Sequence, residues 1–488
     1  MQYLGKIKEE FYRNPLTFSI VVGVLLRVFV AMFNYTPAAV DDYLYVIKPA
    51  LEAFQIGSDI VVNEIRLNIF AYFFYTIIKF FSIFGINNPG TLIGICYVFL
   101  AIFSTSTIVG MHKLGSNYLN KKWNSLLTLL IAIYFFMPIV ATKANQTTFA
   151  LLFIPWSFYF FTKKNSSVKD YFWGAVFLGL TVVVRFQAGI FVIVCGSAFV
   201  ISYIRHRSHE NLQKFFMFIL GGLISIALLA VFDILSGRGA LSTLYNYISY
   251  NFGSNIAAHD YGNSPWYTYI GILLLVFIPP ISIIFLYPFI KGIKNAKLIF
   301  YNFIVFLIFH SLIANKLERF IIPIIPLFML ITFIGLEKLQ EKKLFRKSFI
   351  IFFVLNLIFI VPVATARTQM SLVKAANYLR VQSKAKLYLL DIDFWFHVYV
   401  GYGKLDYPVQ IKKFDNLVSK LKSEKDSQIR LLTLLGLTKT QNTALKKLGI
   451  VCSKTREFQP DFLEAVVVKL NPKHNRRRSK TVLYLCKK

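Results

Sequence analysis

A short charged segment between two apolar runs brings together several side chains that could do chemistry. From His310 to Arg319 the sequence reads His-Ser-Leu-Ile-Ala-Asn-Lys-Leu-Glu-Arg, and Phe-Ile-Ile-Pro-Ile-Ile-Pro follows. Charged residues at a membrane boundary are costly to keep without a use, and Lys and Arg bind phosphate oxygens strongly. The segment therefore predicts an anion-binding site. The alternative is an ordinary hairpin whose Lys316 and Arg319 reach out to lipid headgroups.

Two adjacent acids, Asp41 and Asp42, follow the first apolar run. A carboxylate can act as a general base and take the proton of a reacting hydroxyl. Neighbouring residues of a helix point to different faces, so the two acids cannot form one paired site. One acid could be the base while the other stabilises a turn, caps a helix or binds a cation. Because Asp is a favoured N-cap residue, capping alone is the alternative for either acid.

The composition places these residues in a membrane protein. Of 488 residues, 56% are hydrophobic and 17% aromatic, and apolar runs of about 20 residues recur along the chain. The net charge is +31. Much of it lies in short loops between the apolar runs, which is the orientation signal of a polytopic membrane protein. We therefore expect contacts with membrane lipids and no nucleic acid partner.

The apolar runs predict about eleven transmembrane helices with almost no charge inside them. They cover residues 16–33, 91–112, 125–141, 147–162, 171–185, 187–204, 214–235, 266–290, 298–313, 320–336 and 347–364. In this order the basic N-terminus and every basic short loop lie in the cytoplasm, as the charge rule requires.

One further apolar run, residues 67–85, decides this topology. If it crossed the membrane, the basic loops that follow would all lie outside, against the charge rule. The run contains Lys79 and ends in Asn-Asn-Pro-Gly, which suits a helix lying in the membrane interface. We expect an interfacial helix in the first outer loop, and a crossing helix is the alternative.

With this topology, the unusual polar residues gather on the outer side of the membrane. They are Asp41, Asp42, Glu64, Arg66, Asn145, Arg185, Asp233, Asn251, His259, Asp260, His310, Lys316, Glu318 and Arg319. Polar groups that collect on loops at one membrane surface, with few obvious structural duties, indicate an active site.

Residues 365–488 change in character and predict a small α/β domain after the all-α membrane domain of residues 1–364. Strand patterns cover residues 386–390, 464–468 and 481–485, and helical patterns fill residues 410–448. If this domain is extracytoplasmic, Cys452 and Cys486 could pair. Its basic surface is either simply solvated or faces acidic headgroups or phosphorylated substrates.

A base with cationic donors nearby suits the attack of a hydroxyl on a sugar whose leaving group is a lipid phosphate. The acid takes the hydroxyl proton, and the phosphate dianion needs Lys and Arg rather than a protonating acid. The sequence has no Walker A motif, no Rossmann glycine pattern and no His-Glu-x-x-His spacing. Because no cluster of divalent-metal ligands is apparent, we expect a reaction that uses no metal and no cofactor.

The charged segment also resembles the signature of a known family. Asn315-Lys316-Leu317-Glu318-Arg319-Phe320-Ile321-Ile322-Pro323 is similar to the His-Lys-Glu-x-Arg-Phe-x-x-Pro motif of glycosyltransferase family 22. Further segments resemble elements of that family in the same order: Val40–Tyr43, Arg66, Asp233–Gly237, Tyr250-Asn251, Tyr261–Tyr267 and His310-Ser311. The resemblance covers roughly residues 10–340.

The resemblance implies a GT-C fold and an inverting transfer from a polyprenyl-phosphate sugar, usually mannose, to a lipid-linked or glycan acceptor. Asp41 would be the base, with Asp42 as its alternate. The donor phosphate would be held by Lys316, Arg319, Arg66 and Arg185, and the substrates by His310, Asn315, Glu318, Asn251, Tyr261 and Trp266. The bacterial-like version of the motif implies a bacterial inner membrane with a periplasmic site, or a luminal site if the chain comes from an endoplasmic reticulum.

The sequence also departs from the family pattern. Asn315 stands where the signature has His, Leu317 where it has Glu, and Asp42 where it has the Glu of the first loop. The sugar and the acceptor could therefore differ from the usual ones. Trp266 could instead belong to an interfacial aromatic belt, and Arg185 could anchor the end of a span. A transporter or flippase for a lipid-linked glycan, or a non-catalytic membrane scaffold, remains the alternative function.

Overall fold

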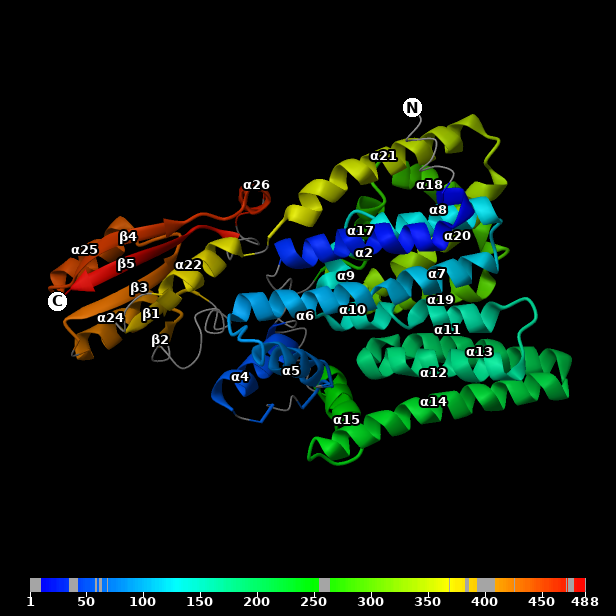
Figure 1. The fold of residues 1–488 in the computed structure, drawn as a ribbon, viewed down its shortest axis with the longest axis horizontal. Helices are drawn as coiled ribbons and strands as arrows, with labels where there is room; N and C mark the ends of the chain where they lie inside the picture. Colours follow the sequence, from blue (N-terminus) through cyan, green and yellow to red (C-terminus); the bar gives the residue numbers. More distant parts are fainter. Residues whose placement is uncertain are drawn as a thin grey trace. The chain divides into compact units, whose positions relative to one another are not determined.

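A computed structural model gives the fold (Figure 1). It describes residues 10–34, 43–57, 59–60, 64–67, 69–253, 264–367, 369–381, 386–392, 409–424, 426–470, 472 and 478–487. The chain divides into two compact units, residues 1–29, 62–69 and 98–364 in the first and residues 30–61, 70–97 and 365–488 in the second. The predicted division at residue 364 into a membrane domain and a separate C-terminal domain stays a prediction.

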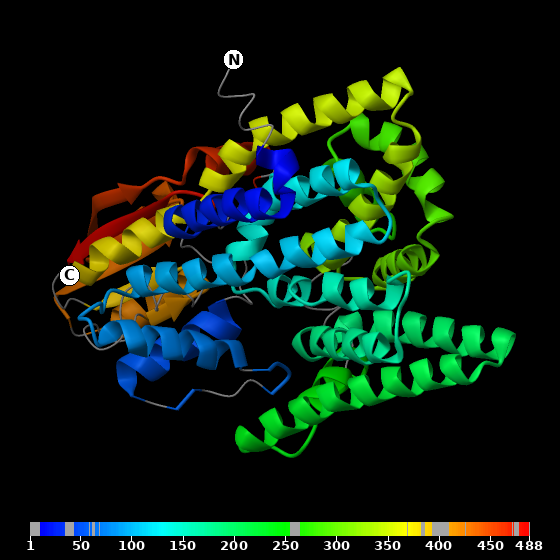
Figure 2. The same cartoon turned by 45° about the vertical axis from the view of Figure 1, so that its right-hand side comes forward.

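Helices fill the chain as far as residue 381. In order they are α2 (Pro15–Phe33), η1 (Tyr43–Ile47), α4 (Lys48–Ile56), α5 (Ile69–Ser82), α6 (Pro89–Phe103), α7 (Thr105–Ser116), α8 (Lys121–Ile133), α9 (Met137–Thr142), α10 (Gln146–Leu151), α11 (Ile154–Thr162), α12 (Val168–Val184), η2 (Phe186–Ala188), α13 (Gly189–His206), α14 (His209–Leu235), α15 (Ser242–Ile248), η3 (Ser249–Gly253), α17 (Thr268–Val276), α18 (Ile281–Ile293), α19 (Lys297–Leu312), η4 (Glu318–Phe320), η5 (Ile322–Ile324), α20 (Ile325–Lys338), α21 (Lys343–Thr365) and α22 (Met370–Val381). Figures 1 and 2 show α12, α13 and α14 side by side in the first unit.

Several helices identify an integral membrane protein. Within the described residues, five are long and apolar enough to cross a membrane: Pro15–Phe33, Pro89–Ser116, Phe186–His206, His209–Leu235 and Lys343–Leu379. A sixth is possible if the pair α17 and α18 counts as one bent span. The count of about eleven spans therefore stays a prediction.

Several apolar runs that read as single spans are broken into shorter helices. The run 125–141 divides into α8 and α9, the run 147–162 into α10 and α11, and α17 and α18 meet at an angle of 101°. Prolines lie at or near these breaks, at Pro138, Pro155 and the pair Pro279-Pro280. Proline has no backbone N–H to donate and favours the start of a helix over its interior. Hydrophobicity alone cannot show such breaks.

A buried arginine of α2 forms hydrogen bonds with the backbone at the break between α8 and α9. Arg27 of α2 is 1% exposed. Its guanidinium donates to the carbonyl oxygens of Ala132 (3.1 Å) and Ile131 (3.4 Å), which lie in the last turn of α8. The Asn356 side chain donates to the Ile133 carbonyl (3.1 Å) and accepts from the Phe135 N–H (2.8 Å). Helix-end carbonyls have no partner in their own helix, so side chains of other helices replace the missing bonds.

The predicted interfacial run 67–85 forms α5. Its 14 residues span about 21 Å at the rise of an α-helix, which is short of a hydrocarbon core of about 30 Å. Its placement in the interface stays a prediction. The segment between α2 and α5 also contains α4, whose start fits Pro49 in the first turn.

The C-terminal residues form a five-stranded mixed sheet in the order β2-β1-β3-β5-β4. Its strands are β1 (Leu387–Leu390), β2 (Val409–Ile411), β3 (Gln428–Leu434), β4 (Val451–Phe458) and β5 (Thr481–Lys487), and its helices are α24 (Phe414–Ser423), α25 (Lys439–Lys447) and α26 (Phe462–Leu470). β1 pairs in parallel with β2 and β3, whereas β5 pairs antiparallel with β3 and β4. Leu417 and Leu421 of α24 and Leu445 of α25 share one core with this sheet. On the other face, Tyr378 of α22 contacts Phe458 of β4.

The structure confirms two of the three predicted strands and corrects the third. The patterns 386–390 and 481–485 become β1 and β5, but residues 464–468 lie in α26. Three consecutive valines suggested a strand. The helix forms because Glu464 is buried and accepts backbone N–H bonds from Gln369 and Met370. The helical reading of residues 410–448 is wrong over β3, which separates α24 from α25.

Cys452 and Cys486 lie opposite each other on β4 and β5 and form a disulfide. Their Cα atoms are 4.0 Å apart. The two remaining cysteines, Cys96 and Cys195, are free and buried.

Candidate functional site

The site is built around Arg185 at the C-terminal end of α12. Arg185 leaves the helical conformation, with φ −145° and ψ 96°, and η2 follows directly. The side chain is 4% exposed. Its Nη1 donates to the Thr147 hydroxyl, but its Nε and Nη2 are buried with no hydrogen-bond partner among the described residues. Burying a guanidinium whose N–H donors have no acceptor costs free energy, and an anion bound here would accept from these donors.

The short helix α10 supplies the partners of two arginines. Asn145 caps it, because its side-chain oxygen accepts from the Thr147 N–H (2.9 Å). This cap fixes the first turn, which carries Gln146 and Thr147. Gln146 accepts from Arg66 Nη1, while the Thr147 hydroxyl accepts from Arg185 and donates to the Arg319 carbonyl (3.3 Å). One turn of helix therefore connects three arginine positions that lie far apart in the sequence.

The signature segment approaches Arg185 through η4. The Phe320 ring contacts two guanidiniums, with the Arg185 Cζ 5.4 Å and the Arg319 Cζ 5.8 Å from its centre. Both distances fit cation–π contacts. Arg185 is also within electrostatic range of Arg66 and Arg319. Like charges held this close repel, so the cluster favours a negative ligand.

Tyr247 of α15 completes one side of the arginine cluster. Its ring packs on Phe186, the residue after Arg185, with centroids 4.8 Å apart. Burial raises the pKa of Tyr247, although the charges of Arg185 and Arg66 act in the opposite direction. The hydroxyl therefore stays protonated at neutral pH and can donate a hydrogen bond.

His310 lies at the end of α19 and is 1% exposed. Its Nδ1 bonds the Phe306 carbonyl (2.9 Å), so this nitrogen carries a proton. The ring stacks on Phe306, with centroids 4.0 Å apart. Nε2 is buried without a hydrogen-bond partner among the described residues, and the ring is within electrostatic range of Arg185. His310 thus adds a third open polar atom to the Nε and Nη2 of Arg185.

Lys316 lies in the loop between α19 and η4 and has two backbone partners. Its ammonium donates to the carbonyl oxygens of Ser264 (2.9 Å) and Ile313 (2.6 Å). The Ser264 N–H in turn donates to the Ala314 carbonyl (3.0 Å). Partial burial lowers the pKa of Lys316. In this arrangement Lys316 fastens the signature loop to the segment before α17, and Asn315 and the exposed Glu318 lie on either side of it.

The other residues predicted for the site are placed less centrally. Asn251 lies in η3 and donates to the Tyr247 carbonyl of its own helical segment (2.8 Å). Trp266 is 65% exposed and contacts Tyr267 edge to face. Asp41, Asp42 and Tyr261 lie outside the described residues. The structure thus brings together Arg66, Arg185, Arg319 and His310.

Asp233 has a structural position at the end of α14. It is fully buried and pairs with Arg238 (3.0 Å). Its carboxylate also accepts from the N–H (3.0 Å) and the hydroxyl of Thr243. These bonds fix the turn that leads into α15 and therefore position Tyr247.

Sequence reasoning missed Gln146, Thr147 and Tyr247. The only local signal was the cap sequence Asn-Gln-Thr-Thr inside an otherwise apolar stretch. Within the described part of the chain, no group of three or more His, Cys, Asp or Glu residues could hold a metal ion. The described site is thus cationic and offers donors, which suits binding and stabilisation of an anionic group.

Solved structures with a similar fold include ArnT and an archaeal oligosaccharyltransferase. The apo crystal structure of ArnT from Cupriavidus metallidurans aligns with a TM-score of 0.60 at 11% identity, over 95% of this chain and 97% of that one. ArnT bound to undecaprenyl phosphate gives 0.59, also at 11% identity, over 96% and 98%. The Archaeoglobus fulgidus oligosaccharyltransferase, in complex with Zn and sulfate, gives 0.51 at 10% identity, over 81% of this chain and 62% of that one. At these identities the likeness shows the fold.

Sequence comparison identifies the family. GPI mannosyltransferase 3 of Debaryomyces hansenii is 24% identical over 332 residues, which cover 65% of this chain and 59% of that protein. The match therefore spans less than two thirds of the relative's length. The pattern of the Alg9-like mannosyltransferase family matches residues 24–410, which is most of the chain. The chain therefore belongs to the Alg9-like mannosyltransferase family.

Proposed function

We propose that this protein is a membrane glycosyltransferase that moves a sugar, mannose by the family's precedent, from a polyprenyl-phosphate donor to a hydroxyl of a lipid-linked or glycan acceptor. One observation carries the proposal: Arg185 is buried with Nε and Nη2 open, beside Arg66 and Arg319. A phosphate offers several oxygens that a guanidinium can bind in a bidentate manner. Binding it would supply partners for the two open nitrogens of Arg185.

The reaction follows from the charges. The carboxylate of Asp41 takes the proton of the acceptor hydroxyl, whose oxygen attacks the anomeric carbon from the side opposite the phosphate. The new carbon–oxygen bond forms as the bond to the phosphate oxygen breaks, and the configuration inverts. The polyprenyl phosphate leaves with the electron pair of the broken bond. Arg185, Arg319, Arg66 and Lys316 stabilise this growing charge, so most of the rate would come from positioning and electrostatics.

Asp42 is the alternate base, and the substrate contacts are assigned to His310, Asn315, Glu318, Asn251, Tyr261 and Trp266. The open Nε2 of His310 favours it as a contact of the phosphate or the sugar. We further propose that no divalent metal takes part, because arginines occupy the role that a metal would have. Transfer that persists in excess chelator supports this point, and loss that added Mg²⁺ or Mn²⁺ restores would contradict it.

The site would face the non-cytoplasmic side. The basic short loops support this orientation through the charge rule. The disulfide between Cys452 and Cys486 favours an oxidising compartment for the C-terminal residues. A bacterial periplasm or an endoplasmic reticulum lumen would both satisfy these conditions. The ArnT structure of similar fold that is bound to undecaprenyl phosphate fits a polyprenyl-phosphate donor.

Broken helices favour one competing function, a transporter for a lipid-linked glycan, because carriers often build their sites from interrupted helices. The breaks here have partners. Arg27 and Asn356 bond the α8 break, and the Tyr134 hydroxyl donates to the Val276 carbonyl at the end of α17 (2.6 Å). These groups are used for packing, which favours the transferase.

The test is a transfer assay in membranes with radiolabelled polyprenyl-phosphate mannose, comparing wild type with Asp41→Asn and with Lys164→Gln, an exposed control. Label should enter a lipid or glycan product with wild type and Lys164→Gln and fall below about one hundredth with Asp41→Asn. Transfer that survives in Asp41→Asn would assign the base to Asp42. Failure with mannose and with a panel of other polyprenyl-phosphate sugars would contradict the transferase and favour the transporter or the scaffold.

A further inference from the structure

The short helix α26 in the C-terminal sheet domain has an apolar stripe that no described residue covers. Phe462, Val466 and Leu470 are spaced four residues apart, so they share one face of the helix. They are 81%, 36% and 80% exposed. The opposite face holds the buried Glu464. Large apolar side chains aligned on one exposed face mark a binding surface more often than isolated ones do.

The position of α26 along the chain points to its partner. Glu464 accepts N–H bonds from Gln369 and Met370 at the start of α22. Asp461, just before α26, lies 3.8 Å from the Arg367 Nε and 3.6 Å from the Lys374 ammonium. These contacts fasten α26 to the chain segment that follows α21.

That segment follows α21 and lies inside the candidate membrane-spanning stretch Lys343–Leu379. Helix α21 closes at Thr365 and is part of one of the apolar stretches long enough to cross a membrane. From Thr365 to Met370 the chain can extend at most about 18 Å. Gln369 and Met370, to which α26 bonds, are therefore at most about 18 Å of extended chain from the end of α21.

The charge next to the stripe fits a lipid surface. Lys469 is exposed beside Leu470, and Arg478 lies within electrostatic range of Glu464. The sequence from 469 to 480 also contains Lys473, Arg476, Arg477 and Lys480 and no Asp or Glu. Basic residues beside an apolar helix face are the usual composition of a helix that lies in the interface of an anionic membrane.

We propose that α26 is an interfacial membrane anchor. Its stripe of Phe462, Val466 and Leu470 enters the boundary between headgroups and acyl chains, while Lys469 and Arg478 face anionic headgroups. This anchor would hold the C-terminal domain on the same bilayer that the helices cross. The inference needs the membrane but not the transfer reaction, so the two proposals can fail separately.

The test uses the full chain in lipid nanodiscs with an environment-sensitive fluorophore on Val466→Cys. The native thiols Cys96 and Cys195 are buried and the other two are disulfide-bonded, so labelling is directed to the new cysteine. The matched control is Thr443→Cys, an exposed position on α25. Helices α25 and α26 lie at opposite ends of β4 (Figure 1), whose eight residues span about 26 Å.

Phospholipids with a nitroxide near the headgroup should quench the label at position 466 by at least about twofold and leave position 443 nearly unchanged. Quenching should be stronger with phosphatidylglycerol than with phosphatidylcholine alone, and Phe462→Ser with Leu470→Ser should abolish it. Quenching of position 466 by aqueous iodide but not by lipid would overturn the proposal. Protection from both quenchers would also overturn it, since the stripe would then be covered by protein.

Discussion

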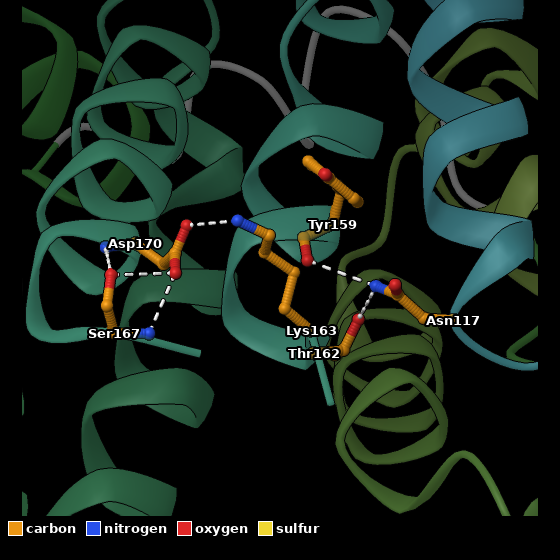
Figure 3. A network of polar contacts seen from close by, with 6 residues as sticks. All are labelled: Asn117, Tyr159, Thr162, Lys163, Ser167 and Asp170. Carbon is orange, nitrogen blue, oxygen red and sulfur yellow. Dashed lines mark hydrogen bonds and ion pairs between the residues drawn. The ribbon is translucent and has the colours of Figure 1, made fainter. Parts of the chain in front are cut away.

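The two ends of α12 hold charged groups that differ in whether their hydrogen-bonding atoms have partners. At its start, Ser167 and Asp170 form a capping box, and Asp170 also accepts from the Lys163 ammonium (2.7 Å). Figure 3 shows this network, in which the neighbouring Asn117 also bonds Tyr159 and Thr162. At its end, the Arg185 guanidinium has one hydrogen-bond partner among the described residues, Thr147, and its Nε and Nη2 have none. The 17 residues of α12 put about 26 Å between the two groups.

This difference distinguishes charged groups that folding explains from one that it does not. At the start of α12 the buried Asp170 accepts from both Lys163 and Ser167, so this pair can be explained by folding alone. A buried charge without enough partners is expected to cost stability, so the end at Arg185 is not explained by folding. The same helix therefore has one end that stabilises the fold and one end that we propose to bind the donor phosphate.

Replacement of Arg185 should have the largest effect on activity. Arg185→Gln removes the charge and the fork of donors, and we expect kcat/KM for transfer to fall by about 10²–10³-fold. Arg185→Lys keeps the charge but loses the fork of donors, so its kcat/KM should lie between those of wild type and Arg185→Gln. Arg205→Gln, at the exposed end of α13, is the control. Activity of Arg185→Gln within about twofold of wild type would remove Arg185 from the donor site.

The same variant separates binding from folding. Without substrate, Arg185→Gln should unfold at the same temperature as wild type or higher, since it removes an under-paired buried charge. Added polyprenyl phosphate should stabilise wild type and not the variant. A clear loss of stability in the ligand-free variant would mean that Arg185 is a structural residue.

Thr147 should give the next largest effect, because its hydroxyl connects Arg185 to the Arg319 carbonyl. Thr147→Val keeps the shape and removes both bonds, and kcat/KM should fall by about tenfold. Thr147→Ser keeps the hydroxyl and should restore most of the activity. Equal losses in the two variants would mean that side-chain packing, and not the hydroxyl, positions the arginines.

The sequence predicted the arginines of the site better than the hydrogen bonds that connect them. Arg66, Arg185 and Arg319 stood out because charge near an apolar run is rare. Thr147 did not stand out, since a threonine in an apolar helix usually bonds its own backbone. Its role depends on how α10 packs against α12 and η4, which no local pattern encodes.

The same limit explains the broken helices and α26. Apolar runs look continuous in the sequence, and the groups that make a break tolerable, Arg27 and Asn356, lie far away in the chain. Likewise Val466–Val468 favour a strand locally, but the contacts of Glu464 with Gln369 and Met370 favour a helix. By contrast, β1 and β5 were predicted correctly because their own residues are strand-forming and buried.

Asp170 should affect stability and not chemistry. Asp170→Asn removes the ion pair with Lys163 and weakens the capping box, and we expect a loss of about 1–2 kcal/mol in the free energy of unfolding. The KM for the donor should stay unchanged, with Lys164→Gln as the neighbouring control. A changed KM with unaltered stability would contradict the assignment of this end of α12 to folding.

The smallest effect should be a pH dependence of the fold's stability that comes from Asp170 and Lys163 at the start of α12. Burial alone would raise the pKa of Asp170, but hydrogen bonds from Lys163 and Ser167 outweigh it, so the pKa lies below its ordinary value. The hydrogen bond to Asp170 also raises the pKa of Lys163. A carboxyl with a lowered folded-state pKa stabilises the fold above its unfolded pKa of about 3.9, and this contribution is lost as the pH falls through the folded value.

The contribution of the pair should therefore be constant from about pH 5 to pH 9. It should decline below that window as Asp170 is protonated, and above about pH 10.4, the unfolded pKa of Lys, as the pH rises through the raised pKa of Lys163. Thermal unfolding in detergent between pH 3 and pH 7 should show a steeper acid loss for wild type than for Asp170→Asn, which has no carboxyl to titrate. Arg185→Gln should keep the wild-type slope, because a guanidinium stays protonated throughout this range. Identical acid slopes for wild type and Asp170→Asn would show that the ion pair contributes nothing, and the contrast between the two ends of α12 would then rest on Arg185 alone.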